Sequence, residues 1–138
     1  MRRLVMLLLG TLSLSAMAAT GSWSDTRHGV TLQNRGVMMS SAALAATRSA
    51  PVRQQVSATI TSVSWKVELL GARPAGLQVQ LCNTVNHCVM LDAEGGMTKS
   101  FYGQAAISPL RFVYFVPGSG ALNTPLRVVS NQVIVNYQ

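Results

Sequence analysis

The chain has 138 residues, with 11 lysines and arginines against four aspartates and glutamates and only two histidines, so few side chains are available for acid–base catalysis or metal binding. The basic residues are scattered singly, which disfavours nucleic-acid binding. The positive net charge favours contact with an anionic surface, such as phospholipid or an acidic protein. An equally weighted alternative is that the charge only maintains solubility.

The first 18 residues have the three parts of a secretory signal peptide. Two arginines precede an apolar run over residues 4–14, which is too short to cross a membrane, and small residues occupy positions 16 and 18. We therefore expect cleavage between Ala18 and Ala19 and export of residues 19–138. That remainder has the size of one domain, and no second domain is expected.

Residues 20–55 give weak signals for regular structure. A first strand is expected at 30–33, after a polar stretch, and Trp23 is expected to fill one end of the core because an exposed tryptophan without a partner is unfavourable. From 35 to 55 no period is sustained, and 42–47 could form at most one helical turn. We interpret 35–55 as a long connection, a kind of segment that is often functional or mobile.

The longest predicted strand covers residues 60–70. Val63, Trp65 and Val67 lie on one face of it, with Leu69, and the intervening polar residues include Lys66 on the other. This two-residue period is typical of a strand with one buried face.

Both cysteines belong to a predicted hairpin. Residues 77–82 and 88–91 alternate so that the inward set is Leu77, Val79, Leu81, Val89 and Leu91, and Cys82 and Cys88 meet on the opposite face at the closed end. A disulfide there would stabilise the fold by about 2 kcal/mol. Free thiols are one alternative. The other is a zinc site that crowds Cys82, His87 and Cys88 into one loop with only the distant His28 as a fourth ligand. Export and spacing favour the disulfide.

The last third of the chain completes an all-β pattern. We expect a turn at 92–96, a strand at 97–101, a central strand at 110–116 covered on both faces, and a turn at 117–120. Two further strands are expected at 126–129 and 133–137, separated by Ser130 and Asn131. About seven or eight short strands in one domain indicate an antiparallel β-sandwich.

No catalytic constellation emerges from these residues, and no cofactor or metal is expected. Asp92 and Glu94 stand two apart in a turn where solvation is expected, so they do not suggest a glycosidase pair. The segment Gly118–Gly120 lacks the following helix of a phosphate loop. The cysteines lack the spacing of a redox dithiol.

Six segments agree in order and spacing with a known family: 29–32, 74–82, 88–92, 109–113, 116–120 and 130–137. They resemble the enterobacterial flagellar protein family FlhE, and 42–57 matches least. The resemblance implies a small periplasmic β-sandwich encoded with the flagellar export genes, accessory or chaperone-like in flagellar assembly and swarming. It also implies that the protein restrains proton leakage through the export apparatus, with export or basal-body proteins as partners.

Two other functions compete with this one. A carbohydrate- or cell-wall-binding module could stack sugars on Trp23, Trp65, Tyr102 or Tyr114, although Trp65 and Tyr114 fall on apolar strand faces and should be buried. A pilin-like subunit completed by a donated strand is disfavoured because the chain has its own C-terminal strand. For a flagellar partner we expect contact through exposed groups such as Arg73, through 35–55 or through the chain ends.

Overall fold

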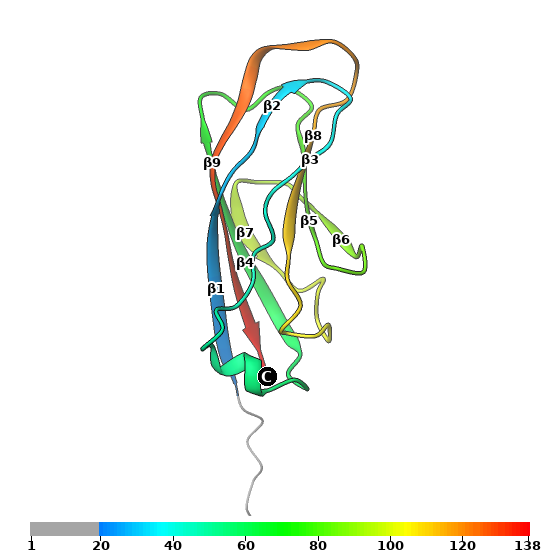
Figure 1. Cartoon of the computed structure of the whole chain (residues 1–138). Coiled ribbons are helices and arrows are strands. Elements are labelled where there is room, and N and C mark those ends of the chain that lie inside the picture. Colours follow the sequence, from blue (N-terminus) through cyan, green and yellow to red (C-terminus); the bar gives the residue numbers. More distant parts are fainter. Residues whose placement is uncertain (1–19) are drawn as a thin grey trace, which may run out of the picture.

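The computed structural model describes residues 20–138, and the predicted signal peptide with its cleavage point between Ala18 and Ala19 lies outside that range. Two antiparallel sheets face each other around one core (Figure 1), which confirms the predicted single-domain sandwich. There are nine strands in the described range: β1 (Gly21–His28), β2 (Thr31–Asn34), β3 (Met39–Ser40), β4 (Ile60–Leu70), β5 (Gln78–Cys82), β6 (Cys88–Leu91), β7 (Gly95–Thr98), β8 (Arg111–Phe115) and β9 (Ala121–Tyr137).

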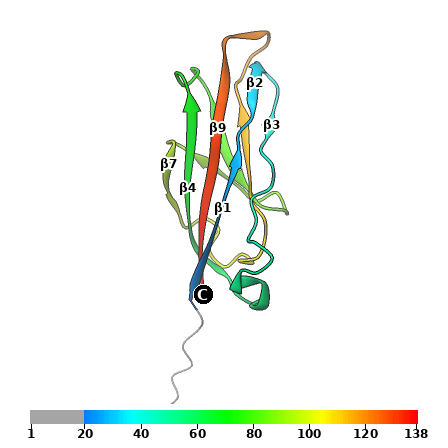
Figure 2. The same ribbon diagram turned by 60° about the vertical axis from the view of Figure 1, so that its left-hand side comes forward.

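The five-stranded sheet has the order β1-β9-β4-β7, and β2 continues the line of β1 along β9. Figure 2 shows these long strands side by side. In β4, Val63, Trp65 and Val67 are buried while Lys66 is exposed, so the predicted faces of this strand are confirmed. Alternation identified β4 correctly because one of its faces covers the core and the other is in solvent.

The four-stranded sheet has the order β3-β8-β5-β6. Phe112 and Tyr114 of β8 are fully buried, and Val113, which points to the other face, is buried as well. The prediction of a central strand covered on both faces is therefore confirmed.

The end of the chain corrects the prediction of two separate strands. β9 is a single strand of 17 residues that runs through Ser130 and Asn131. Asn131 is paired with Arg27 of β1 and Val67 of β4, so the ladders continue on both sides. Its side chain is fully buried, where it accepts a hydrogen bond from the Tyr114 hydroxyl and donates one to the carbonyl oxygen of His28 at 3.4 Å. A polar residue with buried partners does not end a strand.

The polar stretch before residue 29 is also a strand, which the sequence did not indicate. β1 pairs with β9 over its whole length, yet only Trp23 among its residues is buried. Trp23 does fill the core as predicted, and its Nε1 donates a hydrogen bond to the carbonyl oxygen of Ala106 at 2.7 Å. The other residues of this edge strand are exposed or only partly buried, which weakens the alternating pattern.

The predicted turn at 92–96 and strand at 97–101 are both displaced. β7 begins at Gly95, and Phe101 is buried in the following turn. A Cβ atom on Gly96 would lie 2.8 Å from two ring carbons of Trp65, on the neighbouring strand. Glycine at this position therefore makes room for the indole and does not mark a turn.

The connection 35–55 holds only β3 and the short 3-10 helix η1 (Pro51–Gln54), and the suggested helical turn at 42–47 is wrong. Leu44 instead exchanges two backbone hydrogen bonds with Leu110, at 2.7 and 2.9 Å. The amide of Ala45 also donates to Asp25 Oδ2 at 3.0 Å, which ties the connection to β1. Because Leu44, Ala46 and Val52 are buried, the connection closes one side of the sandwich.

Candidate functional site

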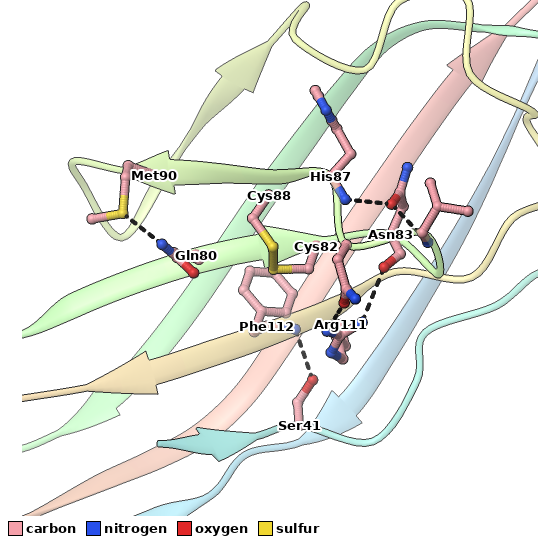
Figure 3. Close-up of a disulfide and its surroundings, with 11 residues drawn as sticks. Ser41, Gln80, Cys82, Asn83, His87, Cys88, Met90, Arg111 and Phe112 are labelled. Atoms are coloured by element: carbon pink, nitrogen blue, oxygen red, sulfur yellow. Dashed lines mark hydrogen bonds between the residues drawn. A yellow bond between two sulfur atoms is a disulfide. The ribbon is translucent and has the colours of Figure 1, made fainter. Parts of the chain in front are cut away.

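The predicted hairpin and its disulfide are present. Strands β5 and β6 pair with Cys82 directly opposite Cys88, and a disulfide joins the two residues (Figure 3). The inward residues of the hairpin are buried, apart from the half-buried Val89: Leu77, Val79, Leu81 and Leu91. Both sulfur ligands of the zinc alternative are therefore consumed in the bridge.

Arg111 of β8 forms hydrogen bonds to the closed end of this hairpin. It lies opposite Cys82 in the register of β5 and β8, and its guanidinium donates to the Asn83 carbonyl at 3.0 Å and to Asn86 Oδ1 at 2.9 Å. Asn83 Oδ1 in turn accepts hydrogen bonds from the amides of Val85 and His87 (Figure 3). Arg111, the one charged residue of β8, thus has a structural role in holding the turn.

The side chain of His87 also stabilises this region, and its contacts are with residues other than the two cysteines. Its Nε2 lies 3.0 Å from the Ser100 carbonyl oxygen, and its ring meets Phe101 edge-on with centroids 5.4 Å apart. Across residues 20–138 no group of three histidines, cysteines or carboxylates is placed to hold a metal ion. Asp92 and Glu94 are exposed near the start of β7, as the sequence led us to expect.

The aromatic residues proposed for sugar stacking do not gather on one surface. Trp23, Trp65 and Tyr114 are buried in the core. Only Tyr102 is well exposed, at 65%. Stacking on a sugar requires accessible aromatic faces. Of the four aromatic residues considered, Tyr102 alone could therefore take part in a sugar-binding site.

The predicted contact regions lie at different places on the sandwich. Arg73 is exposed in the loop between β4 and β5 and lines a surface groove of about 290 Å³ together with Arg35, the first residue of the long connection. Thr20 and Gln138, the first and last residues that the structure describes, line a second hollow of about 360 Å³ beside β1 and β9. The connection also exposes Val37 and Met38.

The sequence predicted Arg73 and the connection that begins at Arg35 as contact regions, but it did not indicate the other wall of their groove. Leu122, Asn123 and Thr124 come from the start of β9, about fifty residues further along the chain than Arg73. The turn at 117–120 was the only sequence signal for this wall, because it marks where the chain returns from β8 into β9. The two arginines lie in the same groove because of the topology of the fold, and their spacing in the sequence could not predict this.

These features define a small antiparallel β-sandwich with one disulfide and with grooves on its surface. The family model described as "Flagellar protein FlhE" matches residues 29–138. The chain therefore belongs to the flagellar protein FlhE family, and the resemblance seen in the sequence is confirmed.

Curated relatives and solved structures agree with this assignment. Flagellar protein FlhE of Salmonella typhimurium is 49% identical over all of both chains, and that of Escherichia coli K12 is 44% identical over the same extent. The crystal structure of FlhE superposes with a TM-score of 0.80 at 47% identity, covering 88% of this chain and 99% of that one. A serine protease of Aeromonas sobria shares the fold alone, with a TM-score of 0.62 at 12% identity over 88% of this chain and 28% of the protease.

Within the part of the chain that the structure describes, there is no helix with the length and apolar character needed to cross a membrane.

Proposed function

We propose that the chain is a periplasmic, non-enzymatic accessory protein of flagellar assembly and swarming that limits proton leakage through the flagellar export apparatus. Membership of the FlhE family is the observation that carries the flagellar role. The secretory signal expected over residues 1–18 and the disulfide between Cys82 and Cys88 support a periplasmic site of action, because disulfides persist in oxidising compartments.

The mode of action that we propose is binding, in a chaperone-like manner, to a protein of the export apparatus or basal body. Cys82 and Cys88 are joined to each other and so offer no free thiol, and His87 Nε2 lies at hydrogen-bond distance from the Ser100 carbonyl oxygen. What the described surface offers instead is grooves and exposed apolar side chains such as Met38. A folded domain of this kind can restrain a channel by occupying or shaping a partner.

Fractionation and co-purification test this proposal together. The protein with a C-terminal tag should be recovered from the periplasmic fraction with its first residue at Ala19. From flagellated cells it should co-purify with export or basal-body proteins, and from cells lacking the export apparatus it should not. Recovery from the cytoplasm with residues 1–18 retained would overturn the periplasmic site. The same co-purified proteins from both kinds of cell would overturn the flagellar partner.

A further inference from the structure

The groove that contains Arg35 and Arg73 lies at the end of the sandwich opposite the C-terminus, where β2 ends and β9 begins (Figure 1). The buried side chain of Leu122 and the half-buried Pro74 give it an apolar floor. Asn123 and Thr124 are exposed along its rim. The groove therefore combines a small apolar surface with polar groups and two guanidinium side chains.

Backbone hydrogen bonds fix the walls of the groove. The amide of Arg35 donates to Gly120 at 2.8 Å, and the amide of Leu77 donates to Pro74 at 3.2 Å. Gly118 has a φ of +111°, and the stem of Arg35 lies against it, since a Cβ there would be 3.2 Å from Arg35 Cδ. Any side chain at Gly118 would press on Arg35, so glycine allows the guanidinium its position.

The charge of the groove is uncompensated. Within residues 20–138 the ion pairs are Arg27 with Asp25 and Lys66 with Glu68, so neither groove arginine contacts a carboxylate. No acidic residue lines the groove in that range. One guanidinium N–H of Arg73 donates a hydrogen bond to the Leu77 carbonyl at 3.3 Å. This bond orients the guanidinium and leaves its other N–H donors available to a ligand.

A third positive charge lies close to this end of the sandwich. Arg127 of β9 is exposed and is paired in register with Leu70 of β4 and Thr31 of β2. The carboxylate facing this region from β4 is that of Glu68, and it is already paired with Lys66 at 3.5 Å. The net field at this end therefore favours an anion.

We propose that this groove binds carboxylate side chains of an acidic protein segment. Guanidinium groups match carboxylates in geometry, and the apolar floor can accept the methylene groups of a glutamate or of a neighbouring residue. A membrane surface fits less well, because the remaining cations do not extend one basic face: Arg53 lies in η1 at the other end of the molecule and Lys66 is paired (Figure 1). This inference adds the chemical class of the partner to the proposed function. It rests on that function only in assuming that a protein partner exists.

The test is a titration of the purified chain 19–138, labelled with nitrogen-15, with an acetylated and amidated octapeptide of alternating glutamate and alanine. Amide shifts should concentrate at Arg73, Asn123 and Thr124. The double variant Arg35→Gln and Arg73→Gln should bind about tenfold more weakly, since charged hydrogen bonds are lost. The matched control, Arg48→Gln with Lys99→Gln, removes the same charge at exposed sites outside the groove and should bind within about twofold of the parent protein.

A second variant keeps the test decisive if the arginine changes disturb the loops. Thr124→Glu leaves both arginines in place but adds a negative charge to the exposed rim, so it should also weaken binding. Shifts spread over the whole surface, equal loss in the control variant, or no shifts at the groove would each overturn the proposal. So would equal or tighter binding of inorganic phosphate at the same amides, or capture by phosphatidylglycerol vesicles that the double variant abolishes. None of these results bears on the fractionation or on co-purification with flagellar proteins, so this inference and the proposed function fail separately.

Discussion

Tyr114 on β8 donates the hydrogen of its hydroxyl group to Asn131 on β9, and this hydrogen bond joins the two sheets inside the core. Asn131 also donates to the carbonyl oxygen of His28 on β1. One buried amide therefore connects three strands from both layers. Because buried polar groups are costly when unpaired, this pair specifies how the sheets stack as well as stabilising them.

The first prediction is that Tyr114→Phe destabilises the protein although it removes a single oxygen atom. The variant leaves Asn131 Oδ1 buried without its donor, which should lower the free energy of unfolding by about 1 to 3 kcal/mol. Urea denaturation of residues 19–138 measures this. Tyr102→Phe, at an exposed tyrosine, is the control and should change stability little. Equal stabilities of the two variants would show that the cross-sheet hydrogen bond contributes nothing.

The same tyrosine predicts an alkaline dependence of stability. Burial raises the pKa of the Tyr114 phenol above its ordinary value. The folded protein therefore holds this proton at pH values where the unfolded chain loses it. The contribution of the protonated phenol to the free energy of unfolding is fully present below about pH 10 and decreases as the pH rises further.

Urea denaturation between pH 8 and pH 11 checks this dependence. Above about pH 10 the parent protein should lose stability more steeply than Tyr114→Phe, which has no phenol to ionise at that position. Parallel curves for the two proteins would contradict the assignment of the effect to Tyr114.

Another prediction concerns the disulfide between Cys82 and Cys88. Cys88→Ser should lower stability by about 2 kcal/mol, because the unfolded chain gains the entropy of an open loop. The double variant with serine at both positions should lose a similar amount, and reductant should not affect it. Thiol labelling of the exported protein under denaturing, non-reducing conditions should find neither cysteine free. Labelling of both cysteines would refute the bridge in the cell.

The buried face of β4 predicts a contrast between adjacent residues. Trp65→Ala should cost about 3 to 5 kcal/mol, because it opens a cavity beside Gly96 and removes the hydrogen bond from Nε1 to the Ala93 carbonyl. Lys66→Ala should be nearly silent, since its exposed ion pair with Glu68 contributes little. Thermal melting compares the two variants. Similar melting temperatures would mean that the faces of β4 are exchanged.

Strands with one buried and one solvated face, such as β4, and the strand that is apolar on both faces, β8, could be predicted from the sequence. The mostly polar strand β1 could not. Trp65 and Leu81 occupy alternating apolar positions, and both are buried as expected. β1 carries one buried residue and was missed for that reason. Asn131 was predicted to separate two strands because its partners, Tyr114 and the His28 carbonyl, are far away in the sequence.

The candidate site depended even more on topology. The sequence identified Cys82 and Cys88 as neighbours because the hairpin is local. Arg73 was predicted as an exposed contact group and Arg35 only as the start of the connection 35–55. The meeting of two loops with the start of β9 places both residues in one groove. Gly96 illustrates the same limit, since its role is set by Trp65 on another strand.

The cytoplasmic pH of cells in mildly acid medium, measured with a ratiometric reporter, tests whether the protein limits proton entry through the flagellar export apparatus. The measurement compares cells with and without this gene, in backgrounds that do and do not make the flagellar export apparatus. If the protein limits proton entry through that apparatus, deletion should acidify the cytoplasm only where the apparatus is present, and restoring the exported protein should reverse the change. Equal acidification in both backgrounds, or none in either, would contradict the account.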